Sequence, residues 1–209
     1  MTAREEILGR LKRAAHEEDH PPAWQSRRNF GDLAGRFADS LTAVKGEVIR
    51  AKNLDEAWAE LDKLLGQFQA HKVVANDEPP LSEIDLPGRW PMPEWHIVGR
   101  SQGDLREFCA LADVGLSGAS AALAETGSIV IESGAGRSRM ATLLPPVHIA
   151  LVATSLLTAD IFTWVASRPR SSMPAGLTLV SGPSKTADIE QTLAIGVHGP
   201  KRLIVLLYD

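Results

Sequence analysis

Three glycine-rich stretches carry most of the side chains that could do chemistry. The first runs from Gly115 to Ser128 and places Glu125 just before a predicted strand at 128–131. Because glycine permits a positive φ and a close approach of the backbone to a ligand, Gly127 and Ser128 are candidate ligand-binding residues. Glu125 can act as a nucleophile or general base if burial or a neighbouring charge tunes its pKa. The alternative is an exposed glutamate, or a structural one that binds the amides of the turn.

The second stretch covers residues 132–149 and contains two arginines after a glycine turn. Arg137 and Arg139 are candidate ligand-binding residues, since guanidinium groups bind carboxylate or phosphate in a bidentate manner. His148 stands at the start of the next predicted strand. It is a candidate acid or base, and the alternative is a histidine that only hydrogen-bonds a neighbouring loop.

The third stretch covers residues 181–201, where a predicted strand runs into a glycine loop and then a short helix beginning near Asp188. Free amides and the positive end of a helix dipole would converge there and form a cradle for an anion. The residues around Lys185 do not match the phosphate-binding loop of ATPases, which excludes that class. His198 lies between two glycines and could reach the same site. The other candidate ligand-binding residues of this stretch are Gly182, Ser184, Lys185 and Thr186.

We expect these three turns, joined by a cation, to meet in one pocket that attracts negative charge. No pair of histidines and carboxylates has the spacing of a metal site, so we predict no metal and no cofactor. The single cysteine, Cys109, cannot form an intramolecular disulfide or hold an iron–sulfur cluster. Its helical neighbours Leu105, Phe108 and Ala112 favour a small core residue over a nucleophile.

Composition excludes several functional classes. A net charge of −4 does not suit a general nucleic-acid binder, which needs a basic surface to displace counterions from phosphates. The N-terminus is charged throughout and lacks an apolar signal sequence. The most apolar window, Val147 to Ala166, is too polar for a membrane span, since it is interrupted by His148, Thr154, Ser155, Thr158 and Asp160. We therefore expect a cytoplasmic protein that does not bind membranes.

Hydrophobic periodicity predicts how the chain positions these stretches. Amphipathic helices are expected at 2–15, 30–44 and 54–68, the first and third with capping boxes at Thr2 and Asn53. Strands are expected at 71–75, 95–98, 128–131, 147–152, 177–180 and 203–207, with helices at 104–111 and 155–166. The segment 76–93 holds five prolines and is expected to be an irregular surface connection.

This alternation of strands and helices favours an α/β fold with helices packed on a largely parallel sheet. A chain of 209 residues can bury one substantial core. We therefore predict a single domain over 1–209, with an N-terminal helical layer at 1–70. The sheet and its glycine-rich loops would occupy 71–209.

Three sequence blocks together resemble the LUD (lactate utilization) family: AETGS at 124–128, TLLPPVHI at 142–149, and GPSKTADIEQTLAIGVHGPK at 182–201. The resemblance covers about residues 112–209. It implies a fold similar to the NagB/RpiA/CoA-transferase superfamily, a sheet with helices on both sides. In CoA-transferase relatives a glutamate is the nucleophile that accepts the acyl group, and Glu125 would be its counterpart. Ser120 and Ala135 depart from the family pattern, which often has aspartate and asparagine there.

The resemblance also implies a role in the oxidation of L-lactate to pyruvate, together with two iron–sulfur partner proteins. The single cysteine fits a subunit that carries no cluster. One hypothesis is therefore an accessory subunit that binds a small anionic ligand. The alternative is a stand-alone enzyme acting on an anionic or CoA-linked substrate, with Glu125 in the chemistry and Lys185 and Arg137 holding charge. A regulatory sensor of lactate or pyruvate has no sequence feature of its own.

Overall fold

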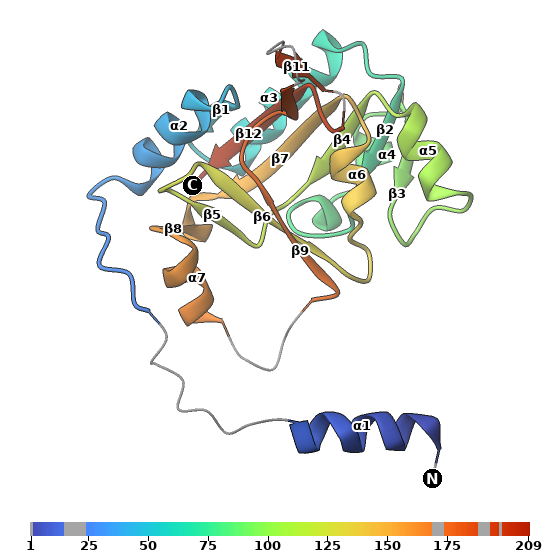
Figure 1. The fold of residues 1–209 in the computed structure, drawn as a ribbon. Helices are drawn as coiled ribbons and strands as arrows, with labels where there is room; N and C mark the ends of the chain where they lie inside the picture. Colours follow the sequence, from blue (N-terminus) through green and yellow to red (C-terminus); the bar gives the residue numbers. More distant parts are fainter. Residues whose placement is uncertain (1, 15–23, 169–173, 188–192, 197) are drawn as a thin grey trace.

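The computed structural model describes residues 2–14, 24–168, 174–187, 193–196 and 198–209. Its centre is a sheet of six strands that are all parallel to their neighbours (Figure 1). Their order across the sheet is β1 (Glu47–Ala51), β12 (Arg202–Tyr208), β7 (Val147–Ala153), β4 (Val114–Ser117), β2 (Lys72–Ala75) and β3 (Glu94–Ile97). The prediction of a largely parallel sheet flanked by helices is confirmed.

A second, smaller sheet lies on one side of the first and was not separated from it in the sequence. Its order is β8 (Leu157–Thr158), β5 (Ala121–Leu123), β6 (Ser128–Ser133) and β9 (Gly176–Val180). Strand β6 is antiparallel to both of its neighbours, β5 and β9. A two-stranded hairpin of β10 (Lys185–Ala187) and β11 (Leu193–Ile195) precedes β12.

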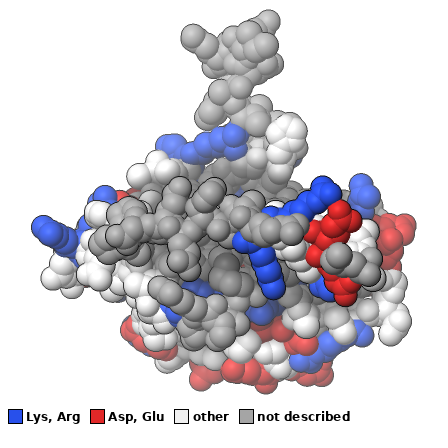
Figure 2. All heavy atoms as spheres, turned by 60° about the horizontal axis from the view of Figure 1, so that its bottom comes forward, with Lys and Arg blue, Asp and Glu red and all other residues white. Residues whose placement is uncertain are grey.

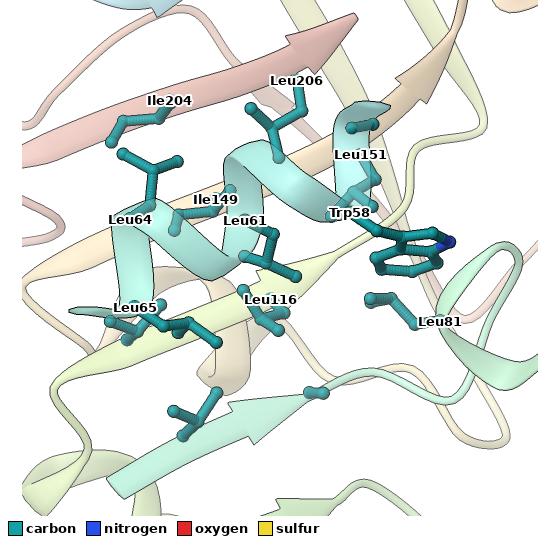
Figure 3. Packing of buried hydrophobic residues seen from close by; sticks show 14 of the residues in the cluster. Trp58, Leu61, Leu64, Leu65, Leu81, Leu116, Ile149, Leu151, Ile204 and Leu206 are labelled. Carbon is teal, nitrogen blue, oxygen red and sulfur yellow. The ribbon is translucent and has the colours of Figure 1, made fainter. Parts of the chain in front are cut away.

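One face of the parallel sheet is covered by α3 (Leu54–Gln67). Figure 3 shows Leu61, Leu64 and Leu65 of this helix pointing onto side chains of β4, β7 and β12. The helix begins at Asn53, whose side chain accepts a hydrogen bond from the Glu56 amide at 2.9 Å, as the capping pattern predicts. Burying each leucine contributes about 1.5–3 kcal/mol, which fixes α3 on the sheet.

The opposite face is covered by three helices and the second sheet. Helix α2 (Leu33–Ala43) buries Phe37 and Leu41 between the two sheets, against Ile129 and Val205. Helices α5 (Leu105–Leu111) and α6 (Arg139–Leu143) cover the same face near β2 and β4. Helix α7 (Ile161–Ser167) packs Trp164 on the outer side of the second sheet.

Two sequence predictions need correction. The segment 76–93 is not only an irregular surface connection, because it forms η1 (Leu81–Glu83) and α4 (Leu86–Arg89) and buries Leu81 and Leu86 in the core. The predicted helix at 155–166 is divided into η2 (Thr154–Leu156), β8 and α7. In the segment 155–166, the apolar residues that predicted one helix are divided between these short elements.

The N-terminal helix α1 (Ala3–Ala14) begins with the predicted capping box. The Thr2 amide donates to Glu5 Oε2 at 2.7 Å, and the Glu5 amide donates to Thr2 Oγ1 at 3.3 Å. The predicted apolar stripe is present on this helix but is exposed, with Leu11 at 62%. No described helix is both long and apolar enough to cross a bilayer. The face turned forward in Figure 2 carries charges of both signs, with acidic side chains mostly along its lower and right margins.

Candidate functional site

A pocket opens where the parallel strands end. In open α/β sheets, ligands bind in the crevice outside the carboxyl ends of the strands. Here a cavity of about 320 Å³ lies among the ends of β7 and β12 and the segments that follow β2 and β4. We call it the carboxyl-edge pocket. It is lined by Glu78, Pro79, Ala119, Ser120, Arg137, Leu151, Ala153, Ser155, Leu156 and Tyr208.

Glu78 is the buried carboxyl group of this pocket, with 9% of its surface exposed. Its Oε1 accepts hydrogen bonds from Asn76 Nδ2 at 3.2 Å and from the Gly118 amide at 3.1 Å. Burial raises the pKa of Glu78 above its usual range, although these two hydrogen bonds and the charge of Arg137 oppose the rise. Glu78 therefore holds its proton to a higher pH than an exposed glutamate does.

Backbone contacts hold this carboxyl group in place. Asn76 is fully buried, and its Oδ1 accepts the Ser138 amide at 2.9 Å, which fixes the direction of its side-chain amide toward Glu78. At Gly118, an added Cβ would lie 2.4 Å from the carbonyl oxygen of Pro79. Only glycine therefore lets the chain after β4 come close enough for its amide to reach Glu78.

Arg137 supplies the positive charge of the pocket. Its Nη1 donates to Glu132 Oε2 at 3.0 Å, and Arg168 forms an ion pair with the other oxygen of Glu132. Burial alone would raise the pKa of Glu132, but the hydrogen bond and charge of Arg168 and the charge of Arg137 hold it below its usual range. Two arginines thus share the carboxylate of Glu132, and Arg137 brings its guanidinium group to the lining of the pocket.

A second cavity lies beside the C-terminal half of α2, and we call it the α2 pocket. It measures about 720 Å³ and is lined by Arg36, Asp39, Ser40, Ala43, Val44, Glu125, Thr126 and Ser181. Glu125 occupies the β5–β6 turn, where its Oε1 lies 2.8 Å from Arg28 Nη2. Its carbonyl oxygen accepts a hydrogen bond from Ser40 Oγ at 3.2 Å. The contacts of Glu125 are those of a residue that anchors the turn to α2 and to the segment before it.

Four other predicted residues lie around the same end of α2. Gly127 has a φ of +66°, and an added Cβ would lie 2.2 Å from the Leu41 nitrogen. Ser128 Oγ lies 2.6 Å from Ser181 Oγ. Lys185 Nζ donates to the Val44 carbonyl at 2.5 Å, and Gly182 passes close to the same carbonyl.

The structure does not bring Gly127, Arg137 and Lys185 into one pocket. Ser128 and Ser133 stand at opposite ends of β6, about 17 Å apart at about 3.4 Å per residue. The β6 strand therefore carries Gly127 to the α2 pocket and Arg137 to the carboxyl edge.

The remaining ligand-binding candidates lie outside both pockets. Arg139 is exposed at the first residue of α6, and His198 is exposed before β12. Ser184 donates its amide to the Pro200 carbonyl, and Thr186 pairs with Ala194 in the β10–β11 hairpin. The chain after Lys185 is thus a strand through Ala187, while the helix predicted near Asp188 falls outside the described residues.

His148 is fully buried and lies inside the sheet. Its Nε2 is 2.8 Å from Ser117 Oγ, and its Nδ1 has no hydrogen-bond partner among the described residues. Burial lowers the pKa of His148 to about 3, and raises the pKa of the buried Cys109 to about 11. These surroundings support the structural alternative for both residues. No cluster of three or more potential metal ligands occurs within the described part of the chain.

Comparison with known proteins identifies the family. The model of the LUD domain matches residues 34–208. The chain belongs to the LUD domain family. A relative named lactate utilization protein C, from Macrococcus caseolyticus, is 36% identical and covers 97% of this chain and 93% of its own length. Another of that name, from Halalkalibacterium halodurans, is 28% identical over 98% of this chain and 94% of its own length.

A solved structure supports the fold of this LUD domain. The crystal structure of a DUF162 family protein from Deinococcus radiodurans aligns with a TM-score of 0.57 at 20% identity. The alignment covers 85% of this chain and 96% of that one. The family match begins at residue 34, so the likeness extends well before the blocks at 112–209.

Sequence reasoning missed Asn76 and Glu78 in this LUD domain. Both lie in the segment 76–93, whose prolines indicated an irregular connection. A usable signal was present, because Asn76, Asp77 and Glu78 directly follow the buried strand β2. Polar residues at the carboxyl end of a parallel strand are positioned to face a ligand.

Proposed function

We propose that this LUD domain takes part in the oxidation of L-lactate to pyruvate as an accessory subunit that binds a small organic anion and carries no iron–sulfur cluster of its own. The names of the relatives support a role in lactate utilization. The single, buried cysteine agrees with a subunit that leaves cluster binding to iron–sulfur partner proteins. The proposal for the ligand rests on one observation, the carboxyl-edge pocket in which Arg137 and Glu78 both take part.

The charges of the pocket suit a carboxylate ligand. Arg137 is the arginine that lines the pocket, so its guanidinium group can pair with the carboxylate of an incoming ligand. Arg137 can donate several N–H groups to a carboxylate in its plane. Glu78, which retains its proton more readily than an exposed glutamate, can donate a hydrogen bond to a hydroxyl or keto oxygen on the neighbouring carbon. A cavity of 320 Å³ admits a ligand of a few carbon atoms.

Isothermal titration calorimetry with L-lactate and pyruvate tests the binding site. Arg137→Ala should weaken binding of the carboxylate by about tenfold or more, since a charge-assisted hydrogen bond contributes about 1.5–3 kcal/mol. Lys185→Ala is the matched control and should bind as the wild type does, because Lys185 lies by the α2 pocket. The reverse result, with Lys185 required and Arg137 dispensable, would move the site to the α2 pocket.

Copurification tests the accessory role. A tagged chain expressed in cells that hold the lactate-oxidizing system should recover iron–sulfur proteins and should be inactive when purified alone. The alternative is a stand-alone enzyme with a CoA-transferase-like fold and Glu125 as the nucleophile. Turnover of an acyl-CoA by the chain alone, abolished in Glu125→Gln, would favour that alternative.

A further inference from the structure

The N-terminal helix α1 presents an apolar stripe that the described residues leave uncovered. Ile7, Leu8 and Leu11 lie on one side of the helix and are 58%, 43% and 62% exposed. A helix of 12 residues is only marginally stable in water, and most helices in proteins depend on packing of an apolar face. The stripe therefore needs a surface to pack against.

A second uncovered apolar surface lies beside α7. The groove there, which we call the α7 groove, measures about 850 Å³ and runs between the segment that starts at Trp24 and the outer side of α7. Phe162 and Val165 form its floor and are 45% and 55% exposed. Trp24 already packs in it, with its ring centroid 4.5 Å from that of Phe162.

The apolar surface continues from the α7 groove onto β9. Leu179 pairs with Val130, whose side chain packs with Trp164 on the outer side of the second sheet. Leu177 and Leu179 face the same side and are 40% and 47% exposed. In Figure 1, α7 and β9 lie on the lower side of the molecule, which is also the side of α1. Adjacent apolar patches of this kind mark a binding surface.

We propose that α1 docks through Ile7, Leu8 and Leu11 onto the α7 groove of its own chain. The length of the connection selects this occupant. Nine residues, 15–23, lie between Ala14 and Trp24, and the ten steps along the chain allow a reach of about 34 Å. Because Trp24 is held in the groove, α1 is tethered close to it at an effective concentration that reaches about the millimolar range. A second copy of the chain at micromolar concentration cannot compete with a tethered helix.

Disulfide trapping tests the docking in the full-length chain. The double variant Leu8→Cys/Val165→Cys places thiols on the stripe and on the floor of the groove. The matched control, Glu6→Cys/Val165→Cys, moves the first thiol to the far side of α1. The natural Cys109 is fully buried and does not compete for oxidation. The stripe pair should form an intramolecular disulfide about tenfold faster than the control pair, a ratio that corresponds to about 1.4 kcal/mol of preference.

The outcomes separate the possible occupants. Faster bridging of the stripe pair within a monomer supports the proposal. Equal rates for the two pairs show that α1 does not prefer the groove, and bridges only between molecules assign the groove to a second copy. Either of these results overturns the proposal.

Hydrogen exchange provides a second readout that does not depend on thiols. Phe162→Asp places a charge in the α7 groove and should remove the preference of α1 for the docked position. The α1 amides should then exchange at least about tenfold faster in this variant than in the wild type. Phe162 is exposed, so the substitution leaves the core intact. Equally fast exchange of the α1 amides in both proteins would contradict the docking.

Discussion

The buried imidazole of His148 predicts that the protein loses stability in mild acid. Its side chain is inaccessible to water, and Ser117 is the residue that hydrogen-bonds its ring. Burial lowers the pKa of His148 to about 3, whereas a histidine in an unfolded chain has a pKa of about 6.5. As the pH falls, the unfolded chain therefore takes up this proton before the folded one. The contribution of neutral His148 to the free energy of unfolding is therefore fully present above about pH 6.5, and it is lost progressively as the pH falls toward 3.

The size of the loss follows from the two pKa values. At pH 5 the ratio of protonated to neutral imidazole is about 30 in the unfolded chain, whereas the imidazole in the folded chain stays neutral. Protonation then favours the unfolded chain by about 2 kcal/mol relative to pH 7.5. Such a loss is a large fraction of the 5–15 kcal/mol or so by which native proteins are stable.

Urea unfolding at pH 7.5 and pH 5 of the wild type and of His148→Gln measures this effect. Glutamine keeps a polar group for Ser117 but does not titrate. The wild type should lose about 2 kcal/mol more than the variant between the two pH values. The difference between the two proteins cancels the pH dependence that other titrating groups give to the free energy of unfolding. One of these groups is Glu78, whose raised pKa makes the folded chain more stable as the pH falls, the opposite of the effect of His148. An equal loss in both proteins, at unchanged m-values, would refute the assignment to His148.

Three further substitutions test the two pockets. Glu78→Gln should become more stable relative to the wild type as the pH rises from 5 to 8, measured by urea unfolding, because the wild type must then ionise a buried carboxyl group. Gly127→Ala should cost about 2–4 kcal/mol in the same assay, since it strains a positive φ and pushes Cβ against Leu41. Glu125→Gln should cost less than about 1 kcal/mol, because its ion pair with Arg28 is partly exposed, and calorimetry should show unchanged anion affinity.

The elements of the fold were predictable where one local pattern decides the structure. In α3, Leu61 and Leu65 recur at helical spacing after a capping residue, and the helix forms as expected. In β7, a short apolar run between turns becomes a buried strand. Prediction failed in segments such as 155–166, where the apolar residues serve two surfaces. Leu157 extends the edge of the second sheet through β8, and Trp164 covers that sheet through α7.

The candidate residues are divided between two pockets because of the course of β6, which no local sequence pattern predicts. Glycines and charged residues flank β6 at both ends, so the sequence marks both ends as functional candidates. Whether they meet depends on the strand running straight between them, and β6 does so because β5 and β9 pair with it along its length. The same pairing brings Arg137 to the edge where β2 and β4 end, beside the Glu78 carboxyl group. The proposed anion site at the carboxyl edge therefore combines residues far apart in the sequence, and the tertiary arrangement of the two sheets brings Arg137 and Glu78 together there.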